Sequence, residues 1–196
     1  MAKVIVNASL SLDGVMQAPG RPDEDVRGGF EHGGWAIPYN DEVMGRVIGE
    51  RMMGPARILL GRRTYEDFAG YWPKQTDNPF TDILGQREKL VASRTLEEPL
   101  PWLNSTLLQG DAVDAVAALR EQPGDDIVVL GSGELAQGLI RRGLVDRYLL
   151  LIHPLVLGSG RRLFPDDGSL AKLRLVDSVP TTTGVVIATY EPENPR

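Results

Sequence analysis

Several segments of this chain combine glycine with polar side chains in a pattern that could bind phosphate. The run Gly131-Ser132-Gly133-Glu134-Leu135-Ala136 follows an apolar stretch and opens an amphipathic one. Glycines let the backbone approach a ligand closely, and the unpaired N–H groups at a helix start favour an anion. The run therefore predicts either a pyrophosphate-binding turn with contacts at Gly131–Leu135, or simply a tight strand-to-helix turn.

A second segment repeats the order of apolar stretch, glycine and helix start. Its residues are Gly61, Arg62, Arg63 and Thr64. Guanidinium groups bind phosphate through paired hydrogen bonds, and the threonine could cap the helix or donate to an oxygen, although both arginines could also be simply solvated. Ser93 and Arg94 follow a further apolar stretch. Such strand ends, if they share one sheet, suit a phosphorylated dinucleotide better than any of them does alone.

A carboxylate stands where the first apolar stretch runs into a long glycine-rich segment, residues 14–38. This residue, Asp13, is placed either to reach a ligand or to satisfy nearby N–H groups in a local turn. Long loops of this kind usually carry function. Gly158 and Gly160 belong to a later glycine-containing segment, which is either a ligand loop or a flexible connector.

The composition excludes several kinds of site. The chain has no cysteine and two histidines, His32 and His153. Thiolate catalysis, cysteine-ligated zinc and disulfides are therefore excluded, and a histidine metal site is disfavoured. There are 21 basic and 27 acidic residues, and the resulting net charge of −6 disfavours a surface that tracks nucleic-acid phosphates. We expect no metal and no nucleic-acid partner.

Length and hydropathy predict one domain and no membrane segment. At about 150 residues per domain, the 196 residues are expected to form a single domain over 1–196. The N-terminus lacks the apolar core of a signal peptide, and the longest apolar run, Tyr148–Ile152, is too short to span a bilayer. A cysteine-free chain also suits a reducing cytosol, so a cytoplasmic location is expected.

Short apolar runs that end in glycine alternate with amphipathic stretches, which is typical of an α/β sheet. Strands are expected over 3–8, 56–60, 90–92, 106–108, 127–130 and 147–157. Helices are expected over 40–53, 62–68, 111–120 and 134–142, with Asn40 and Asp111 as caps of the first and third. Residues 173–179 and 185–190 flank a turn and predict an antiparallel hairpin, followed by a frayed tail from Glu191.

In this order, the segments 7–14, 61–66, 93–95, 131–136 and 158–164 resemble the dihydrofolate-reductase-like superfamily. The resemblance is to the reductase domain of the bacterial riboflavin-biosynthesis deaminase-reductase, and it covers nearly the whole chain. It implies a three-layer α/β fold with a mixed, mostly parallel sheet of about eight strands, helices on both faces and a C-terminal antiparallel hairpin. Because the family's zinc deaminase domain needs cysteines, this chain would be a stand-alone reductase.

The resemblance implies NADPH as the cofactor and assigns residues to it. These cofactor-binding residues are Ala8, Gly61, Arg62, Arg63, Thr64, Ser93, Arg94, Gly131, Ser132, Gly133, Glu134 and Leu135. It also implies contact with the acceptor by Asn7, Trp35, Tyr39, Gly158 and Gly160, although core packing is the alternative for both aromatic residues. Asp13, or a water that it orients, is the candidate for protonating the acceptor.

The implied reaction is hydride transfer from NADPH to a small heterocyclic or sugar-linked acceptor, such as a phosphoribosylamino-uracil. Folate reduction is the first alternative, but the family's folate-binding acid would fall near Met44 and Gly45, where no acid stands. A non-catalytic nucleotide-binding protein is the second alternative. The family also often forms homodimers, so a homodimer is expected.

Overall fold

The computed structural model describes residues 1–168 and 170–193 of the chain, and it divides the chain into two compact units. Unit one comprises Met1–Ile5 and Met52–Leu144, and unit two comprises Val6–Arg51 and Val145–Arg196. Within the described residues, no helix is both long enough and apolar enough to cross a membrane.

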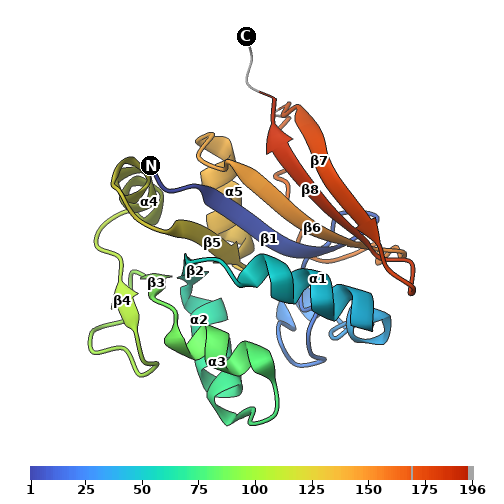
Figure 1. Cartoon of the computed structure of the whole chain (residues 1–196), viewed down its shortest axis with the longest axis horizontal. Helices are drawn as coiled ribbons and strands as arrows, with labels where there is room; N and C mark the ends of the chain where they lie inside the picture. Colours follow the sequence, from blue (N-terminus) through green and yellow to red (C-terminus); the bar gives the residue numbers. More distant parts are fainter. Residues whose placement is uncertain (169, 194–196) are drawn as a thin grey trace. The chain divides into compact units, whose positions relative to one another are not determined.

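The expected mixed sheet is confirmed, and its strands have the order β4-β3-β2-β5-β1-β6-β8-β7 (Figure 1). The strands are β1 Val4–Ser11, β2 Ala56–Gly61, β3 Lys89–Ala92, β4 Ser105–Leu107, β5 Asp126–Leu130, β6 Arg147–His153, β7 Leu173–Pro180 and β8 Val186–Pro192. In unit one, β2 pairs in parallel with β3 and with β5, and β3 pairs in parallel with β4. In unit two, β8 pairs antiparallel with both β6 and β7, as the hairpin pattern predicts.

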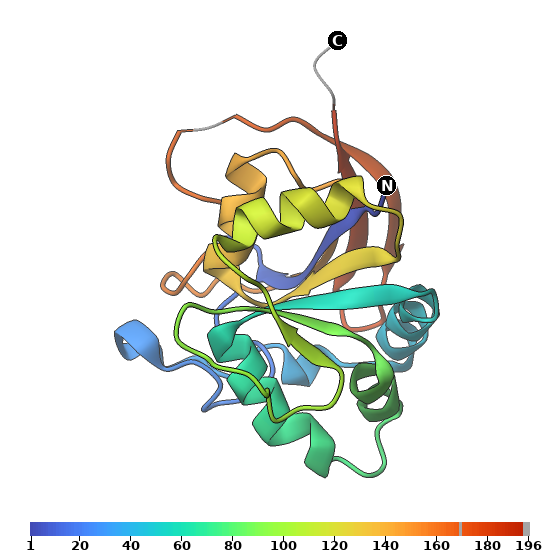
Figure 2. The same cartoon turned by 90° about the vertical axis from the view of Figure 1, so that its left-hand side faces the viewer.

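Unit one has helices on both faces of its parallel strands. Figure 2 shows α4 (Ala112–Glu121) above these strands, and α2 (Arg62–Tyr71) and α3 (Pro79–Gln86) below them. Alternation along β2 explains the arrangement, because Ile58 and Leu60 join the cluster formed with α2 and α3 while Leu59, equally buried, points to the opposite face. The part of β2 that is buried on both faces, residues 58–60, is therefore apolar.

The helix α4 starts where its cap was expected. The carboxylate of Asp111 accepts hydrogen bonds from the N–H groups of Val113 at 2.9 Å and Asp114 at 3.2 Å. The helix α5 (Gly133–Arg141) is followed by Gly143 with φ +62°, the left-handed conformation that commonly ends a helix.

Unit two has an apolar cluster between α1 (Glu42–Met52) and strands β6 and β8. Met44 and Val47 of the helix pack against Leu149 and Ile187. The expected cap at Asn40 is wrong by one residue, because the carboxylate of Asp41 accepts the N–H of Met44 at 2.7 Å. Both side chains could cap a helix. The direction in which the chain leaves the preceding 3-10 turn, Ile37–Tyr39, determines that Asp41 is the cap.

Other boundaries also differ from the sequence expectations. The strand expected over 147–157 ends at His153 because Pro154 has no N–H for the ladder, and the chain turns there through a bond from Leu155 N–H to His153 O of 2.8 Å. Helix α3 was not expected, although Asn78 before Pro79 is a helix-start signal, and Asn78 does accept the N–H of Phe80 at 3.0 Å.

The C-terminal hairpin is longer than expected. Strand β8 extends to Pro192, and Glu193 N–H donates to Lys172 O at 2.8 Å. Fraying from Glu191 is therefore wrong for the residues up to 193, and the remainder of the tail, 194–196, lies outside the described residues.

A buried lysine closes the C-terminal end of α3. Lys89 is 0% exposed, and its ammonium donates to Leu84 O at 2.7 Å, Gly85 O at 3.1 Å and Arg87 O at 2.7 Å. It also lies 4.5 Å from the centroid of the Trp102 ring. A cation suits the exposed carbonyls at a helix end. Burial nevertheless lowers the pKa of Lys89 to about 8.

This lowered pKa predicts a pH-dependent stability. Between about pH 8 and pH 10.5 the unfolded chain keeps the Lys89 proton that the folded protein has released, so raising the pH should stabilise the fold. Urea unfolding of Lys89→Met across this range should lack that increase. The exposed Lys74→Met serves as the control and should keep the slope of the parent. Equal slopes for the parent and Lys89→Met would contradict the assignment.

Candidate functional site

In unit one, the turn between β2 and α2 is hydrogen-bonded to the turn between β5 and α5. The hydroxyl oxygen of Ser132 accepts the N–H of Gly61 at 2.7 Å and lies 3.0 Å from Thr64 Oγ1. The N–H of Ser132 in turn donates to Thr64 Oγ1 at 3.2 Å. We call this set of bonds the Thr64–Ser132 clasp. It brings together two segments that the sequence singled out separately.

The backbone of the second turn is fitted closely to the clasp. Gly131 has φ +56°, and a Cβ placed there would lie 3.1 Å from Thr64 Cγ2 and 3.2 Å from its Oγ1. Ser132 adopts the left-handed conformation with φ 58° and ψ 52°, which is uncommon for a residue with a side chain. Only a glycine at position 131 leaves room for Thr64 to hold this turn.

Helix α5 begins directly after the clasp. Its first intrahelical bond runs from Ala136 N–H to Ser132 O at 2.9 Å, so the backbone N–H groups that precede it have no acceptor within the helix. Those groups belong to Gly133, Glu134 and Leu135. The helix start can therefore hold an anion through its backbone, whereas the Ser132 hydroxyl is used by the clasp.

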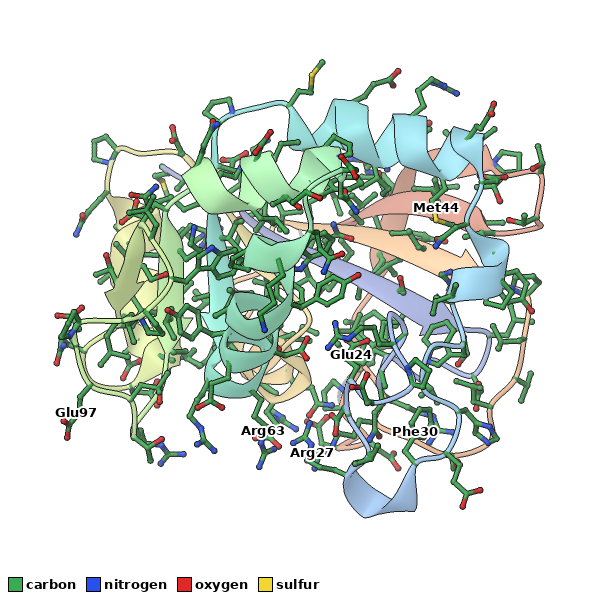
Figure 3. All side chains as sticks on the ribbon, turned by 90° about the horizontal axis from the view of Figure 1, so that it is seen from below. Glu24, Arg27, Phe30, Met44, Arg63 and Glu97 are labelled. Carbon is green, nitrogen blue, oxygen red and sulfur yellow. The ribbon has the colours of Figure 1, made fainter. Side chains whose placement is uncertain are left out.

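The arginines expected to contact phosphate lie at the surface of unit one. Arg62 is 3.8 Å from Glu66, and both side chains are more than two-fifths exposed, at 42% and 48%. Arg63 and Arg94 are exposed, and their side chains have no hydrogen-bond or ion-pair partner among the described residues. Figure 3 shows Arg63 projecting from the start of α2. Each of these cations is available to an anion from solution.

Ser93 shapes the turn that carries Arg94. Its hydroxyl oxygen accepts the N–H groups of Thr95 at 3.1 Å and Leu96 at 3.0 Å. A serine that accepts from residues two and three positions ahead fixes a local turn. In this structure Ser93 orders the backbone around Arg94.

In unit two, Asp13 is held by a set of hydrogen bonds. Its carboxylate accepts the Ser11 hydroxyl at 2.7 Å, the Leu157 N–H at 3.1 Å and the Gly158 N–H at 2.9 Å. These bonds, with that from Ser11 the strongest, lower the pKa of Asp13 to about 2 despite partial burial. Asp13 is therefore ionised at neutral pH, and it can accept or orient a proton donor but cannot itself donate.

Two partners of Asp13, Ser11 and Arg162, lie in the segments 7–14 and 158–164 that the sequence singled out, but neither was assigned a role of its own. Ser11 and Asp13 are two positions apart at the end of a strand, a spacing that places side chains on one face and could have indicated their contact. Arg162 donates from Nε to the Asp13 carbonyl at 2.8 Å and places its guanidinium 3.5 Å from the carboxylate. That contact joins residues 149 positions apart, and no local pattern indicates it.

The structure explains why glycine stands at positions 158 and 160. Gly158 has φ +75°, and its N–H is the one bound by Asp13. Gly160 has φ +114°, and a Cβ there would lie 2.7 Å from Val15 Cγ1 and 2.8 Å from Phe30 Cε2. Position 160 therefore requires glycine because of close packing.

The aromatic candidates lie around a buried histidine. Trp35 is 7% exposed, donates from Nε1 to Gln17 O at 2.7 Å and meets the His153 ring edge-on at a centroid distance of 5.1 Å. Tyr39 is half-buried and meets the same ring at 5.6 Å. Trp35 packs as a core residue, whereas the partly exposed Tyr39 remains open to a ligand.

The remaining candidates lie on β1. Ala8 is 6% exposed, and Asn7 is half-buried, with no hydrogen-bond partner for its side-chain amide among the residues that the structure describes. A half-buried amide without a partner can bind a polar ligand group.

The clasp predicts a pair of stability changes. Thr64→Val keeps the side-chain shape but leaves the N–H of Ser132 without its acceptor, which should cost about 1–3 kcal/mol in urea unfolding. Thr64→Ser retains the hydroxyl and should cost less. If both variants unfold at the urea concentration of the parent, the clasp contributes nothing to stability.

Comparisons with known proteins identify the family of the chain. The family model of the RibD C-terminal domain matches residues 2–187. The protein YyaP of Bacillus subtilis is 33% identical over 141 residues, which cover 68% of this chain and 72% of YyaP.

Solved structures share the fold at low identity. A protein of Shewanella sp. PV-4 assigned to riboflavin biosynthesis has a TM-score of 0.69 and 21% identity, covering 99% of this chain and 100% of that one. Dihydrofolate reductase from Enterococcus faecalis, in complex with NADP(H) and RAB-propyl, has a TM-score of 0.60 and 14% identity, with coverages of 98% and 97%. The fold is thus dihydrofolate-reductase-like, and the chain belongs to the RibD C-terminal domain family.

Proposed function

We propose that this reductase of the RibD C-terminal domain family uses NADPH to reduce a small heterocyclic or sugar-linked acceptor. The observation that carries the proposal is the Thr64–Ser132 clasp, which holds two strand-glycine-helix turns together in unit one. One turn leads into the start of α5 and the other carries Arg62 and Arg63. A helix start and neighbouring arginines suit a ligand with more than one phosphate.

The residues of unit one fit the phosphates of NADPH. The pyrophosphate is assigned to the backbone N–H groups at Gly133–Leu135, and Gly61 and Gly131 allow the close turns that present them. The 2′-phosphate is assigned to Arg62, Arg63 and Arg94, with Ser93 holding the turn that presents Arg94. Ala8 is assigned to the cofactor as well. When bound, NADPH supplies the hydride.

The residues of unit two are assigned to the acceptor. Asp13 is ionised and already accepts two backbone N–H groups, so its proposed task is to orient the acceptor or a water that delivers the proton. Asn7, Tyr39 and Gly158 are proposed to contact the acceptor, while Trp35 and Gly160 support that region through packing. An acceptor of the phosphoribosylamino-uracil class agrees with the name of the Shewanella relative.

The surroundings of α1 disfavour folate as the acceptor. Met44 is 8% exposed and packs in the cluster with Leu149 and Ile187. The nearby Asp41 is used as the helix cap and also accepts the N–H and hydroxyl of Thr182, both at 2.7 Å. A carboxylate committed to these bonds does not serve a pterin. The second alternative, a non-catalytic nucleotide-binding protein, would bind the nucleotide but would show no turnover.

A cytoplasmic homodimer is also proposed. Strand β7 ends the strand order, and its apolar side chains Leu175 and Val176 are 50% and 44% exposed. An exposed apolar edge strand favours pairing with another chain, here a second copy. The cytoplasmic location follows the absence of cysteine from the sequence.

Cofactor preference provides the test of the proposed function. A hydrogen bond to a charged partner contributes about 1.5–3 kcal/mol, so Arg94→Ala or Arg62→Ala should weaken NADPH binding about tenfold to a hundredfold. NADH binding should hardly change, because NADH lacks the 2′-phosphate. Gly133→Val should weaken both cofactors by blocking the helix start. Binding is measured by fluorescence titration at two salt concentrations.

Arg46→Ala serves as the control, because Arg46 is likewise exposed, pairs with Glu50 within α1 and lies outside the assigned site. Equal affinity of the parent for NADPH and NADH, insensitive to salt and to both arginine substitutions, would overturn the cofactor assignment. Binding without oxidation across a panel of acceptors would instead favour the non-catalytic alternative.

Asp13 should act on the acceptor and not on the cofactor. Asp13→Asn removes the negative charge, so turnover should fall at least about tenfold while the NADPH Kd stays within about twofold. Because the pKa of Asp13 is about 2, the parent should show no activity limb from this residue above pH 4. Stability from its bonds is present above the unfolded value of 3.8 and is lost as the pH falls through about 2. Unchanged turnover in Asp13→Asn would remove it from the mechanism.

A further inference from the structure

The side chain of Gln17 is buried in unit two and binds backbone groups of two separate segments. It is 4% exposed, and its Nε2 donates to Asp25 O at 3.0 Å and Arg27 O at 2.9 Å. Its Oε1 accepts the N–H of Arg161 at 3.0 Å. A carboxamide offers two donor hydrogens and an acceptor oxygen, so both ends of this side chain are in use.

The backbone around Gln17 is bound as well. Its carbonyl accepts Trp35 Nε1 at 2.7 Å, and the N–H of the preceding Met16 donates to Arg161 O at 2.8 Å. The position of Gln17 is thus fixed by its own backbone bonds. Its side chain can therefore hold the Asp25 and Arg27 carbonyls and the Arg161 N–H in place.

One segment that it holds is the outer part of the glycine-rich loop. Val26 is 61% exposed, and Gly28 and Gly29 have positive φ of 69° and 72°. Little apolar burial orders this stretch before Phe30, which is 6% exposed. Figure 3 shows Glu24, Arg27 and Phe30 on this loop. The order of this loop therefore depends on polar bonds. Two of these bonds come from the buried side chain of Gln17.

The other segment is the one that also binds Asp13. The Asp13 carboxylate accepts the N–H groups of Leu157 and Gly158, and Gln17 accepts that of Arg161. Between these points lies Gly160, packed too closely against Val15 for any side chain. The segment 157–161 is therefore held at both ends by side chains of the segment 13–17.

We infer that Gln17 is a positioning residue, which acts on Asp13 through the segment 157–161 and on the loop through Asp25 and Arg27. The inference rests on the proposed function, in which Asp13 orients the acceptor or its proton source. In this proposal Gln17 contacts neither the acceptor nor the proton source. Its carboxamide helps to keep the Leu157 and Gly158 N–H groups in place, and these two groups, together with the Ser11 hydroxyl, hold the Asp13 carboxylate.

Two variants separate the two sets of bonds that this side chain makes. We call the bonds to Asp25 O and Arg27 O the loop arm, and the bond from Arg161 N–H the Asp13 arm. Gln17→Met keeps the length and loses every polar bond, so both segments should loosen. Gln17→Glu keeps an acceptor for Arg161 N–H but loses the donors to Asp25 O and Arg27 O, so only the loop should loosen. Gln75→Met is the matched control, because Gln75 is a partly buried glutamine of unit one whose Nε2 donates to Tyr71 O at 3.3 Å.

The loop arm is measured by limited proteolysis with trypsin under native conditions. Cleavage between Arg27 and Gly28 should accelerate at least about tenfold in both Gln17 variants and remain at the parent rate in Gln75→Met. The Asp13 arm is measured by NMR titration of the carboxyl carbon. In Gln17→Met the Asp13 pKa should rise above the parent value of about 2 but stay below 3.8, because the Ser11 hydroxyl still donates, whereas in Gln17→Glu it should stay near the parent value.

Kinetics then connect both arms to the reaction. With an acceptor that the parent reduces, Gln17→Met should lower kcat at least about tenfold, leave the NADPH Kd within about twofold, and Gln17→Glu should restore part of kcat. A parent-like kcat in Gln17→Met, or a parent-like Asp13 pKa in that variant, would overturn the inference. If the parent reduces no acceptor, the proposed function fails by itself, and the proteolysis and titration still decide whether Gln17 positions the loop and Asp13.

Discussion

The need of backbone N–H groups for an acceptor is the constraint on which the candidate sites of this protein depend. Turns at strand ends leave such groups outside the ladders, and a buried N–H without a partner is costly. Here side chains supply the acceptors. Ser132 accepts from Gly61, and Thr64 accepts from Ser132. In unit two, Asp13 and Gln17 accept from the segment 157–161.

This constraint explains why polar residues with apparent catalytic potential are also structural. The bonds that hold Asp13 in place are the ones that lower its pKa, so the same contacts fix its position and keep it charged. The Ser132 hydroxyl is likewise occupied by the clasp, which leaves the backbone at the start of α5 as the anion-binding element. Arg63 and Arg94, which follow the parallel strands β2 and β3, are exposed to solvent, where their charge costs little to maintain.

The periodicity of the sequence was sufficient to predict most elements of both units. The runs at 58–60 and 127–130 are apolar because these parts of β2 and β5 lie inside a parallel sheet. Asp111 was predicted as a cap because its helix pattern begins directly after it. Where two polar residues were adjacent, as at Asn40 and Asp41, local sequence did not decide between them. Helix α3 was not predicted because its 8 residues are too few for a clear helical periodicity.

The sequence by itself determined which residues could do chemistry: glycines before helix starts, arginines beside them and a carboxylate at a strand end. It also determined the family resemblance, since the order of those motifs is a property of the chain. Only the tertiary structure decided which of them meet, because Thr64 with Ser132 and Asp13 with Leu157 are separated by 68 and 144 positions. Only the tertiary structure also revealed that the Gln17 side chain binds the glycine-rich loop and the segment 157–161. A buried carboxamide acquires its role from the backbone groups around it, and no local pattern encodes contacts that folding brings together over such separations.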